Sequence, residues 1–415
     1  RTRRQDPHSQ PLLHPTTKHT HTSNFLSPSP SLTPPPPTRP TSPLPQATPT
    51  PNQHDSVSQK RPNWEASASS CPNLNCKEKN AFSLQSMENV IFGGSGPTGK
   101  AVARYLVSKG HKCACVSRSG NVPKELEDLK EGVIGVKGDA LDAGRCQDIC
   151  KSAKRVFFCL GLEYSSSVWS RDFPVALDNV LSAVPQDAVF VMADNLYMFG
   201  AEQAGKVLSP TLPFTTIGVK PKLRGEMNRT IQKYHDEGRC KTVIMRAADF
   251  YGPEVTNSAL GEHVFAKIRD DSAPAVVQPM EHRHAFTFVP DQAEAMVEAS
   301  MEPKAWGKAL HCPCAEARVY RHVIQDIANE YQKPDLGKSP QQLVGWTRGM
   351  LGMFIGPLAE MQEMQYQWDQ DFLVDHSDYL ALFPKSALPT PMDKGITATV
   401  AWYQTNKPDK KGWFG

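Results

Sequence analysis

The chain has 415 residues, of which 36 are proline, and its formal net charge at neutral pH is +3. Sixteen prolines and a local excess of five positive charges lie in residues 1–86, so residues 87–415 carry a net charge of −2. This balance gives no reason to expect a nucleic-acid partner. The sequence contains no run of about 18 uncharged apolar residues, which argues against a membrane-spanning segment.

Residues 1–86 differ in composition from the rest of the chain. They are rich in Ser, Thr and Pro and lack apolar periodicity, so we expect them to be disordered. No methionine precedes Met87. We therefore expect residues 1–86 to be either untranslated sequence read into protein or an incomplete targeting segment. The predicted location is cytoplasmic, or a plastid or another organelle if residues 1–86 are a transit segment.

From Met87 onward, short apolar runs alternate with amphipathic helical stretches. Their Val, Ile, Phe and Ala content is typical of parallel strands that helices cover on both faces. The pattern predicts an α/β fold with a doubly wound, Rossmann-like parallel sheet, whose ligands bind beyond the carboxyl ends of the strands. The expected strands lie at residues 89–94, 113–118, 133–138, 155–161, 188–194 and 242–249.

A glycine-rich turn directly follows the first expected strand. Its glycines let the backbone turn tightly and approach a pyrophosphate, and Pro97 suits the first turn of a helix whose amino end points at the phosphates. This strand–turn–helix context predicts a dinucleotide site. The residues that we assign to it are Gly93, Gly94, Ser95, Gly96, Pro97, Thr98 and Gly99.

The end of the second expected strand indicates which dinucleotide binds. It carries Ser117, Arg118 and Ser119, and no carboxylate follows until Glu125. An arginine accommodates a ribose 2′-phosphate, whereas an acidic residue would bind the 2′-hydroxyl. We therefore predict NADP(H) over NAD(H). Asp139, which follows the third expected strand, is a candidate contact for the adenine edge.

Several phrases resemble a known family. They are GGSGPTG (93–99), ADNLYMFG (193–200), RAADFYGP (246–253) and FTFVPDQAEAM (286–296). They resemble the atypical extended short-chain dehydrogenase/reductases labelled NAD-dependent epimerase/dehydratase. The last two of these phrases, together with PLAEMQEMQYQW (357–368) and TATVAWY (397–403), are similar to a little-characterised bacterial-type subgroup. The resemblance implies an NAD(P)-binding Rossmann domain over 87–313, a mostly helical substrate-capping region over 314–415 and a small-molecule substrate. A homodimer remains an open alternative.

The region from about Cys314 onward has helical patterns at residues 320–332, 340–353 and 357–368. Met and aromatic residues at helical spacing there are typical of a packed core.

The resemblance also implies a catalytic Tyr-x-x-x-Lys pair on a helix, with a Ser or Thr at the end of the fifth strand. Two such spacings, Tyr105 to Lys109 and Tyr403 to Lys407, lie in the wrong parts of the chain. At the expected place stands Lys222, with Gly218 instead of a tyrosine four residues before it, and Asn195 falls near the expected serine. We therefore assign catalytic roles to Lys222, which would also hold the cofactor ribose, to Asn195, and to Tyr197 as the substitute proton donor.

Other residues remain weaker candidates. Tyr251 follows a strand, and residues 281–284 offer two imidazoles and a guanidinium, since His acts as an acid or base near neutral pH. His263 and Arg246 are further candidates. The cysteine pairs 113/115 and 312/314 lack the CxxC spacing of metal sites, so no metal is expected and the thiols are interpreted as reduced and buried.

These patterns favour an NADP(H)-dependent oxidoreductase with an atypical active site. One alternative is a sugar-nucleotide epimerase or dehydratase, and another is a non-catalytic NADP(H)-sensing protein.

A shortened chain tests the boundary at Met87. We expect a protein that begins at Met87 to fold and to bind NADPH as tightly as the full chain, because residues 1–86 supply no core. Fluorescence titration with NADPH measures this affinity. Loss of binding in the shortened protein would assign a structural role to residues 1–86.

Overall fold

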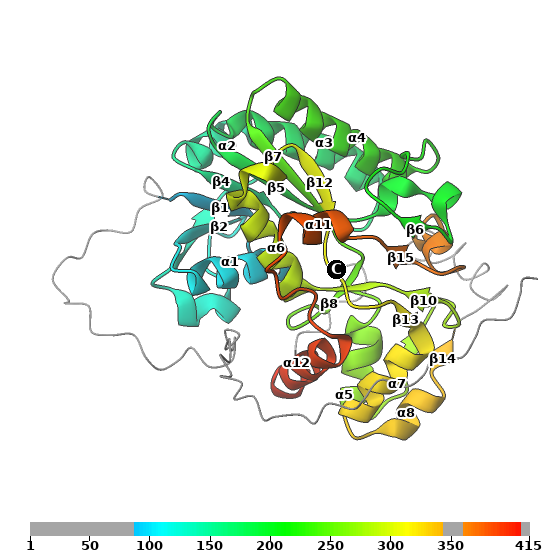
Figure 1. The fold of residues 1–415 in the computed structure, drawn as a ribbon. Coiled ribbons are helices and arrows are strands. Elements are labelled where there is room, and N and C mark those ends of the chain that lie inside the picture. Colours follow the sequence, from blue (N-terminus) through cyan, green and yellow to red (C-terminus); the bar gives the residue numbers. More distant parts are fainter. Residues whose placement is uncertain (1–86, 343–359, 408–415) are drawn as a thin grey trace, which may run out of the picture. The chain divides into compact units, whose positions relative to one another are not determined.

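The computed structural model describes residues 87–342 and 360–407. A seven-stranded sheet forms its centre, in the order β12-β7-β5-β4-β1-β2-β3 (Figure 1). Every neighbouring pair is parallel, and the strand order reverses beside β1, as in a doubly wound Rossmann sheet. The predicted α/β class is confirmed. The strands are β1 (Asn89–Phe92), β2 (Cys113–Ser117), β3 (Val133–Lys137), β4 (Arg155–Phe158), β5 (Val189–Asp194), β7 (Lys241–Arg246) and β12 (Lys308–His311).

The six strands expected from the sequence are all present. The seventh, β12, was not expected, because its four residues include only two apolar ones, Ala309 and Leu310. It pairs with β7 from Lys308 to His311 and extends the sheet at that edge. A strand this short gains its stability from pairing and burial, so its own pattern gives little signal.

Helices cover both faces of the sheet. One face packs against α1 (Pro97–Ser108) and α6 (Val289–Met301), and the other against α2 (Ala143–Cys150), α3 (Ser166–Ala183) and α4 (Val219–Asp236). Successive strand residues point to opposite faces. Val90 and Phe92 therefore enter the core beneath α2 to α4, while Ile91 enters the core beneath α1 and α6.

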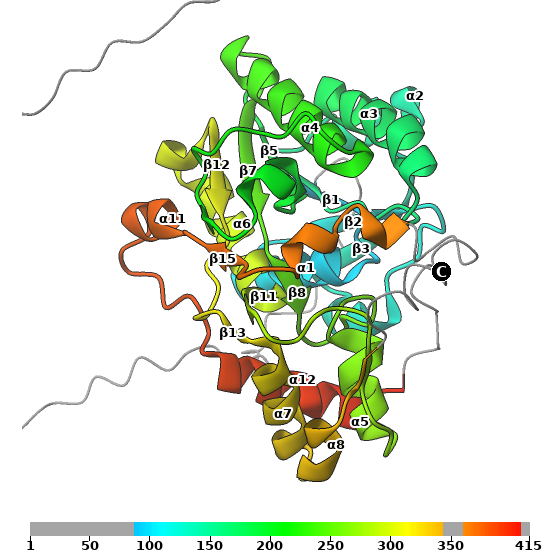
Figure 2. The ribbon, with the colours of Figure 1, turned by 90° about the vertical axis from the view of Figure 1, so that its right-hand side faces the viewer.

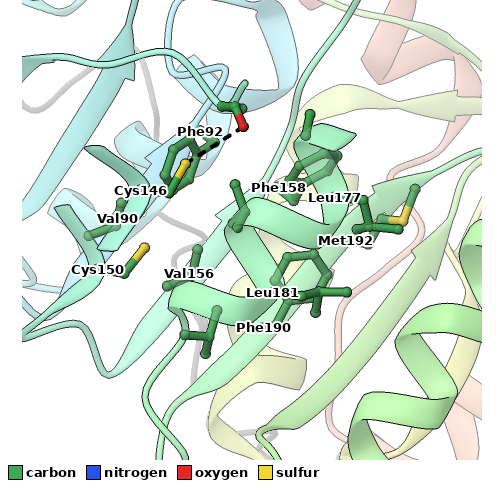
Figure 3. Close-up of a cluster of buried hydrophobic side chains, with 14 of the residues drawn as sticks. Val90, Phe92, Cys146, Cys150, Val156, Phe158, Leu177, Leu181, Phe190 and Met192 are labelled. Atoms are coloured by element: carbon green, nitrogen blue, oxygen red, sulfur yellow. Dashed lines mark hydrogen bonds between the residues drawn. The ribbon is translucent and has the colours of Figure 1, made fainter. Parts of the chain in front are cut away.

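The core beneath α2 and α3 is built from large apolar side chains (Figure 3). The rings of Phe158 and Phe190 lie 5.8 Å apart between centroids. Leu177 of α3 packs in the same core, and the Cys146 thiol donates to the Ala140 carbonyl at 3.7 Å.

All eight cysteines in the described part of the chain are free and buried, and burial raises the pKa of the Cys314 thiol to about 12. Within the described residues there is no cluster of three or more His, Cys, Asp or Glu suited to a metal ion. None of the helices described is long and apolar enough to cross a membrane.

A second core lies beyond the sheet. It joins residues 251–288 to residues 320–403, with Tyr251, Phe286, Tyr320 and Tyr403 at its centre. It thus contains residues from both sides of Cys314, and the domain boundary at 313/314 stays a prediction. Its elements are β8 (Asp249–Tyr251), the π-helical turn η5 (Gly261–Ala266), α5 (Lys267–Arg269), β11 (Phe286–Phe288), α7 (Tyr320–Glu330), α8 (Pro334–Lys338) and α12 (Met392–Thr405).

Of the helices expected in this region, α7 confirms the one at 320–332. Residues 343–359 lie outside the described residues, so most of the expected helix at 340–353 is not covered. Residues 360–362 are helical, followed by the 3-10 turn η7 (Gln365–Gln367). The remaining short elements are η2 (Lys124–Leu129), η3 (Tyr197–Phe199), η4 (Ala201–Gln203), β6 (Val207–Leu208), β9 (Ala275–Val276), β10 (Arg283–His284), η6 (Pro303–Ala305), β13 (Arg318–Val319), β14 (Gln341–Gln342), β15 (Leu373–Val374) and α11 (Ser377–Leu382).

A substitution in the core tests this packing. We expect Phe190→Ala to lower the free energy of unfolding by about 3–5 kcal/mol, because it removes a fully buried ring and leaves a cavity. Urea denaturation followed by circular dichroism measures the change. Val175→Ala, at a side chain that is 47% exposed, is the control and should cost about 0.5 kcal/mol or less.

Candidate functional site

A cleft of about 1240 Å³ lies at the carboxyl ends of the central strands. The glycine-rich loop after β1 and the ends of β2 and β3 form one part of its wall, which we call the dinucleotide end. Residues 159–176, the end of β5, residues 247–250 and residues 361–368 form the other part, which we call the substrate end. The fold thus brings residues far apart in sequence to one cleft, at the position where parallel α/β sheets bind ligands.

The glycine-rich loop has the shape that a pyrophosphate requires. Gly93 has φ +79°, and a Cβ atom there would lie 2.4 Å from the Cys159 carbonyl oxygen. A Cβ atom on Gly99 would lie 2.3 Å from the Gly93 oxygen. Helix α1 begins after Gly96 with no side-chain cap, which leaves its first N–H groups for a ligand.

The seven predicted loop residues divide into two groups. Five of them line the cleft, and Gly94 and Gly99 support the loop from behind, where Gly94 packs on Cys115. The residues lining the cleft are Gly93, Ser95, Gly96, Pro97 and Thr98.

The predicted ribose and adenine contacts lie at the dinucleotide end. Ser117, Arg118 and Asp139 line the cleft, and Ser119 supports Ser117 with its hydroxyl oxygen at 3.2 Å. Arg118 is exposed, and no hydrogen bond or ion pair engages it within residues 87–342 and 360–407. The Asp139 carboxylate accepts from the Leu141 N–H at 3.0 Å, which closes a tight turn.

A carboxylate also reaches this end of the cleft. Glu125 pairs with the buried Lys100 at 2.8 Å, and Lys100 pairs with Glu254 at 2.9 Å. Burial raises the pKa of Glu125, but the hydrogen bond from Lys100, a backbone hydrogen bond and the charges of Lys100 and Arg104 together lower the pKa overall. Glu125 is therefore an ionised carboxylate that already forms an ion pair with Lys100.

The structure places Lys222 away from the cleft, contrary to expectation. Its side chain is 58% exposed and pairs at 3.8 Å with Glu226 on the outer face of α4. The inner face of α4 instead carries Lys220 and Arg224, one helical turn apart and both buried. The expected place of Lys222 in the cleft was wrong, because the apolar positions of α4 turn the opposite face of the helix inward.

Arg224 forms the floor of the substrate end. Its guanidinium pairs with Asp194 at 3.2 Å and stacks on the Trp169 ring, 4.7 Å from the ring centre. Asn228 donates to the same carboxylate at 2.6 Å and accepts from Arg246 at 2.8 Å. Burial lowers the pKa of Arg246 to about 10, and Arg246 is not part of the cleft lining.

Asn195 and Tyr197, which follow the end of β5, line the cleft together with Arg224. The Asn195 side-chain oxygen accepts from the Tyr197 N–H at 3.1 Å, and the Tyr197 ring stacks on Trp169. Burial, followed by the charge of Asp249, raises the pKa of Tyr197, while a hydrogen bond with Tyr164 and the charge of Arg224 oppose that rise. The Tyr197 hydroxyl is therefore protonated at neutral pH and is able to donate.

The weaker candidates from the sequence differ in whether they reach the cleft. His284 is buried and its Nε2 lies 2.7 Å from the Asp249 carboxylate, which lines the cleft. Arg283 is exposed and pairs with Asp371. Tyr251 belongs to the second core, and burial lowers the pKa of His263, outside the cleft, to about 4.

Sequence reasoning missed Lys100, Tyr164, Trp169, Asp194 and Arg224. For Arg224 a signal was available. The apolar residues of α4 at 223, 227 and 231 follow helical spacing, and this spacing places positions 220 and 224 on the same inward face.

Lys222 provides a direct test of its corrected placement. We expect Lys222→Ala to bind NADPH within twofold of the unaltered protein, because its exposed ion pair contributes little. Isothermal titration calorimetry measures the affinity. A large loss of NADPH binding would show that Lys222 does reach the cofactor.

Comparisons with known proteins agree with this architecture. The model of the NAD dependent epimerase/dehydratase family matches residues 89–310. No protein of curated function matches the chain. Among solved structures, WbmH of Bordetella bronchiseptica in complex with NAD+ is 18% identical, with a TM-score of 0.59 over 77% of this chain and 98% of that one.

Two other solved structures are similar to the chain. The UDP-N-acetylglucosamine 4-epimerase of Methanobrevibacter ruminantium M1 is 15% identical, with a TM-score of 0.62 over 77% of this chain and 98% of that one. The UDP-glucuronic acid 4-epimerase of Bacillus cereus, in complex with NAD, is 14% identical, with a TM-score of 0.61 over 79% of this chain and 100% of that one. At these identities the likeness establishes the fold, and the sequence match establishes the family. The chain belongs to the NAD dependent epimerase/dehydratase family.

Proposed function

We propose that the chain is an NADP(H)-dependent oxidoreductase that acts on a small, uncharged carbonyl or hydroxyl compound. The observation that carries this proposal is the lining of one cleft by the glycine-rich loop at one end and by Tyr197, Arg224 and Asp249 at the other. This arrangement joins a dinucleotide cradle to a proton donor. Two of the solved structures named above are complexes with NAD or NAD+, which supports a nicotinamide cofactor.

The residues of the loop fit such a cofactor. The close contacts that Cβ atoms would make at Gly93 and Gly99 leave a cradle of backbone, and the uncapped start of α1 favours a negatively charged group. The bound dinucleotide would supply the hydride donor or acceptor. The protein residues would hold its phosphates and orient the substrate beside it.

The preference for NADP(H) rests on two side chains at the dinucleotide end. Arg118 is exposed and unpaired among the described residues, so its guanidinium is available to a 2′-phosphate. Glu125, the nearby carboxylate, is paired with Lys100. Because Glu125 already has a partner, it is a poor acceptor for a ribose hydroxyl.

Tyr197 is the proposed proton donor and acceptor. Its phenol lines the cleft, it forms a hydrogen bond with Tyr164, and its pKa lies above the usual range. In the direction of reduction, Tyr197 would give its hydroxyl proton to the substrate oxygen. Arg224 would stabilise the resulting phenolate, since its charge acts to lower the pKa of Tyr197.

The charges of the substrate end favour an uncharged substrate. Arg224 is paired with Asp194 and Arg171 with Asp172, so both arginines of this wall are already neutralised. Glu163 and Asp249 add negative charge. A diphosphate placed beside these residues would meet the carboxylates of Glu163 and Asp249, which is unfavourable.

Two alternatives remain distinct from this proposal. The solved structures include epimerases of UDP-sugars, and turnover of UDP-glucose would support a sugar-nucleotide epimerase or dehydratase. Gly218 stands four residues before Lys222, where the family pattern has a tyrosine, and Asn195 stands near the expected serine. These two departures motivate a non-catalytic NADP(H) sensor. Tight NADPH binding without oxidation across a broad carbonyl panel would support the sensor.

The cofactor preference is tested at Arg118. We expect Arg118→Asp to weaken NADPH binding by about 100-fold, because a bidentate contact to the 2′-phosphate is replaced by repulsion, while NADH binding changes by less than about threefold. Fluorescence titration with both cofactors measures this. Arg229→Asp, on the exposed face of α4, is the charge control, and an equal loss of both cofactors would contradict the assignment.

The proton donor is tested at Tyr197. We expect Tyr197→Phe to lower the rate of NADPH oxidation by about 100-fold or more, because the proton source is removed. The rate is followed by absorbance with a panel of uncharged aldehydes and ketones. Tyr234→Phe is the control, since the Tyr234 hydroxyl bonds to Ser182 and Asp178 outside the cleft. Unchanged turnover in Tyr197→Phe would refute the role.

A further inference from the structure

The segment Glu360–Trp368, which we call the strap, forms one wall of the substrate end (Figure 2, orange). The core of Tyr251 and Tyr320 includes its last residue, Trp368. Its charged residues point the other way, toward the first turns of α3 and α4. The strap residues that line the cleft are Met361, Gln362, Met364, Gln365, Gln367 and Trp368.

Glu360 fastens the strap to the start of α3. Its carboxylate accepts from the backbone N–H of Ser166 at 3.0 Å and from the Ser166 hydroxyl at 2.5 Å. Burial raises the pKa of Glu360, but hydrogen bonds from Lys220 and Ser166 outweigh burial and lower it. The carboxylate is therefore ionised at neutral pH, as a negative group at a helix N-terminus should be.

Glu363 fastens the strap to the start of α4. Its carboxylate accepts from the backbone N–H groups of Val219 and Lys220, the latter at 3.2 Å. Helix α4 has Gly218 at its N-cap and therefore no cap side chain of its own. Gly218 has φ +82°, and a Cβ atom there would lie 2.7 Å from the Glu363 carboxylate, so glycine leaves the space that Glu363 occupies.

Lys220 lies between the two glutamates. Its ammonium group pairs with Glu360 and donates to the Ser166 hydroxyl at 3.0 Å, while Glu363 lies at 3.5 Å. The Lys220 side chain is 0% exposed. A buried lysine in the first turn of a helix is unfavourable without anionic partners. The strap supplies these partners, because it carries the carboxylates of Glu360 and Glu363.

The far end of the strap contacts the groups proposed to react. The Tyr366 hydroxyl donates to the Tyr197 carbonyl oxygen at 3.1 Å. The Trp368 ring stacks on His284 at 3.7 Å between centroids, and His284 holds Asp249. Movement of the strap would therefore alter the placement of both Tyr197 and Asp249.

We propose that the strap is a positioning device for the substrate end. Lys220, Glu360 and Glu363 fasten it across the starts of α3 and α4, and through Tyr366 and Trp368 it fixes Tyr197 and Asp249. Lys220 is thus a positioning residue, although it stands one turn before Arg224 on the face of α4 directed toward the cleft. The role given to Tyr197 rests on the proposed function, whereas the fastening does not.

Hydrogen–deuterium exchange of the full chain tests the fastening. First-turn amides have no acceptor within their own helix, so they exchange rapidly unless another group bonds them. We expect the amides of Ser166, Val219 and Lys220 to be protected in the unaltered protein. In Glu360→Ala/Glu363→Ala they should exchange about tenfold faster or more, together with residues 360–368 and with the amides of residues 198–200, which follow Tyr197.

Glu226→Ala, at an exposed carboxylate on the same helix, is the control and should leave these amides unchanged. Unprotected amides at Ser166, Val219 and Lys220 in the unaltered protein would overturn the fastening even if the double variant does not fold. Faster exchange of the strap without any change at residues 198–200 would overturn the positioning role. We expect the double variant to bind NADPH within twofold of the unaltered protein. If the unaltered protein does not bind NADPH, the proposed function is refuted, but the fastening of the strap is not.

Discussion

The buried pairing of Asp194 with Arg224 is the constraint on which the cleft depends. Asp194 ends β5 and Arg224 lies in the second turn of α4, so their contact fixes the helix against the central sheet. A charge removed from water in this way must keep its partner, because an isolated buried charge is very costly. The apolar positions of α4 select its inner face, and the pairing holds that face against β5 and, with it, Lys220 and the strap.

Much of the fold followed from the sequence because its signals are local. Six apolar runs and the glycine-rich turn predicted the parallel sheet and the dinucleotide end, because each of these signals is contained within a short segment of the sequence. The prediction for Lys222 relies on its resemblance to the lysine of the Tyr-x-x-x-Lys motif. It does not consider the apolar residues of α4, which turn Lys220 and Arg224 inward instead. Contacts such as Lys100 with Glu254 join residues 154 positions apart, and no pattern within either segment indicates the other.

The substrate end shows why the residues proposed to be catalytic are harder to predict than those proposed to bind the cofactor. A pyrophosphate is bound largely by backbone, so the need for glycine leaves a recognisable spacing. Tyr197, Asp249 and Arg224 come from three separate elements, and their arrangement depends on tertiary packing. Tyr197 could be found because it closely follows a strand, whereas its contacts from other segments, such as Tyr164 and Trp169, could not.

The shared ion pairs of Lys100 have a geometric consequence for access to the cleft. The Lys100 ammonium group on α1 binds both Glu125 of η2 and Glu254, which follows β8. Two segments from different halves of the sequence therefore contact the same side chain. A buried lysine does not readily release both carboxylates. Arg104, one turn further along α1, joins the same segments, since it pairs with Asp128 of η2 and with Glu254. The separation of these two segments at the dinucleotide end is therefore set by two residues of one helix, and it places an upper limit on how far the mouth of the cleft opens while Lys100 and Arg104 remain paired.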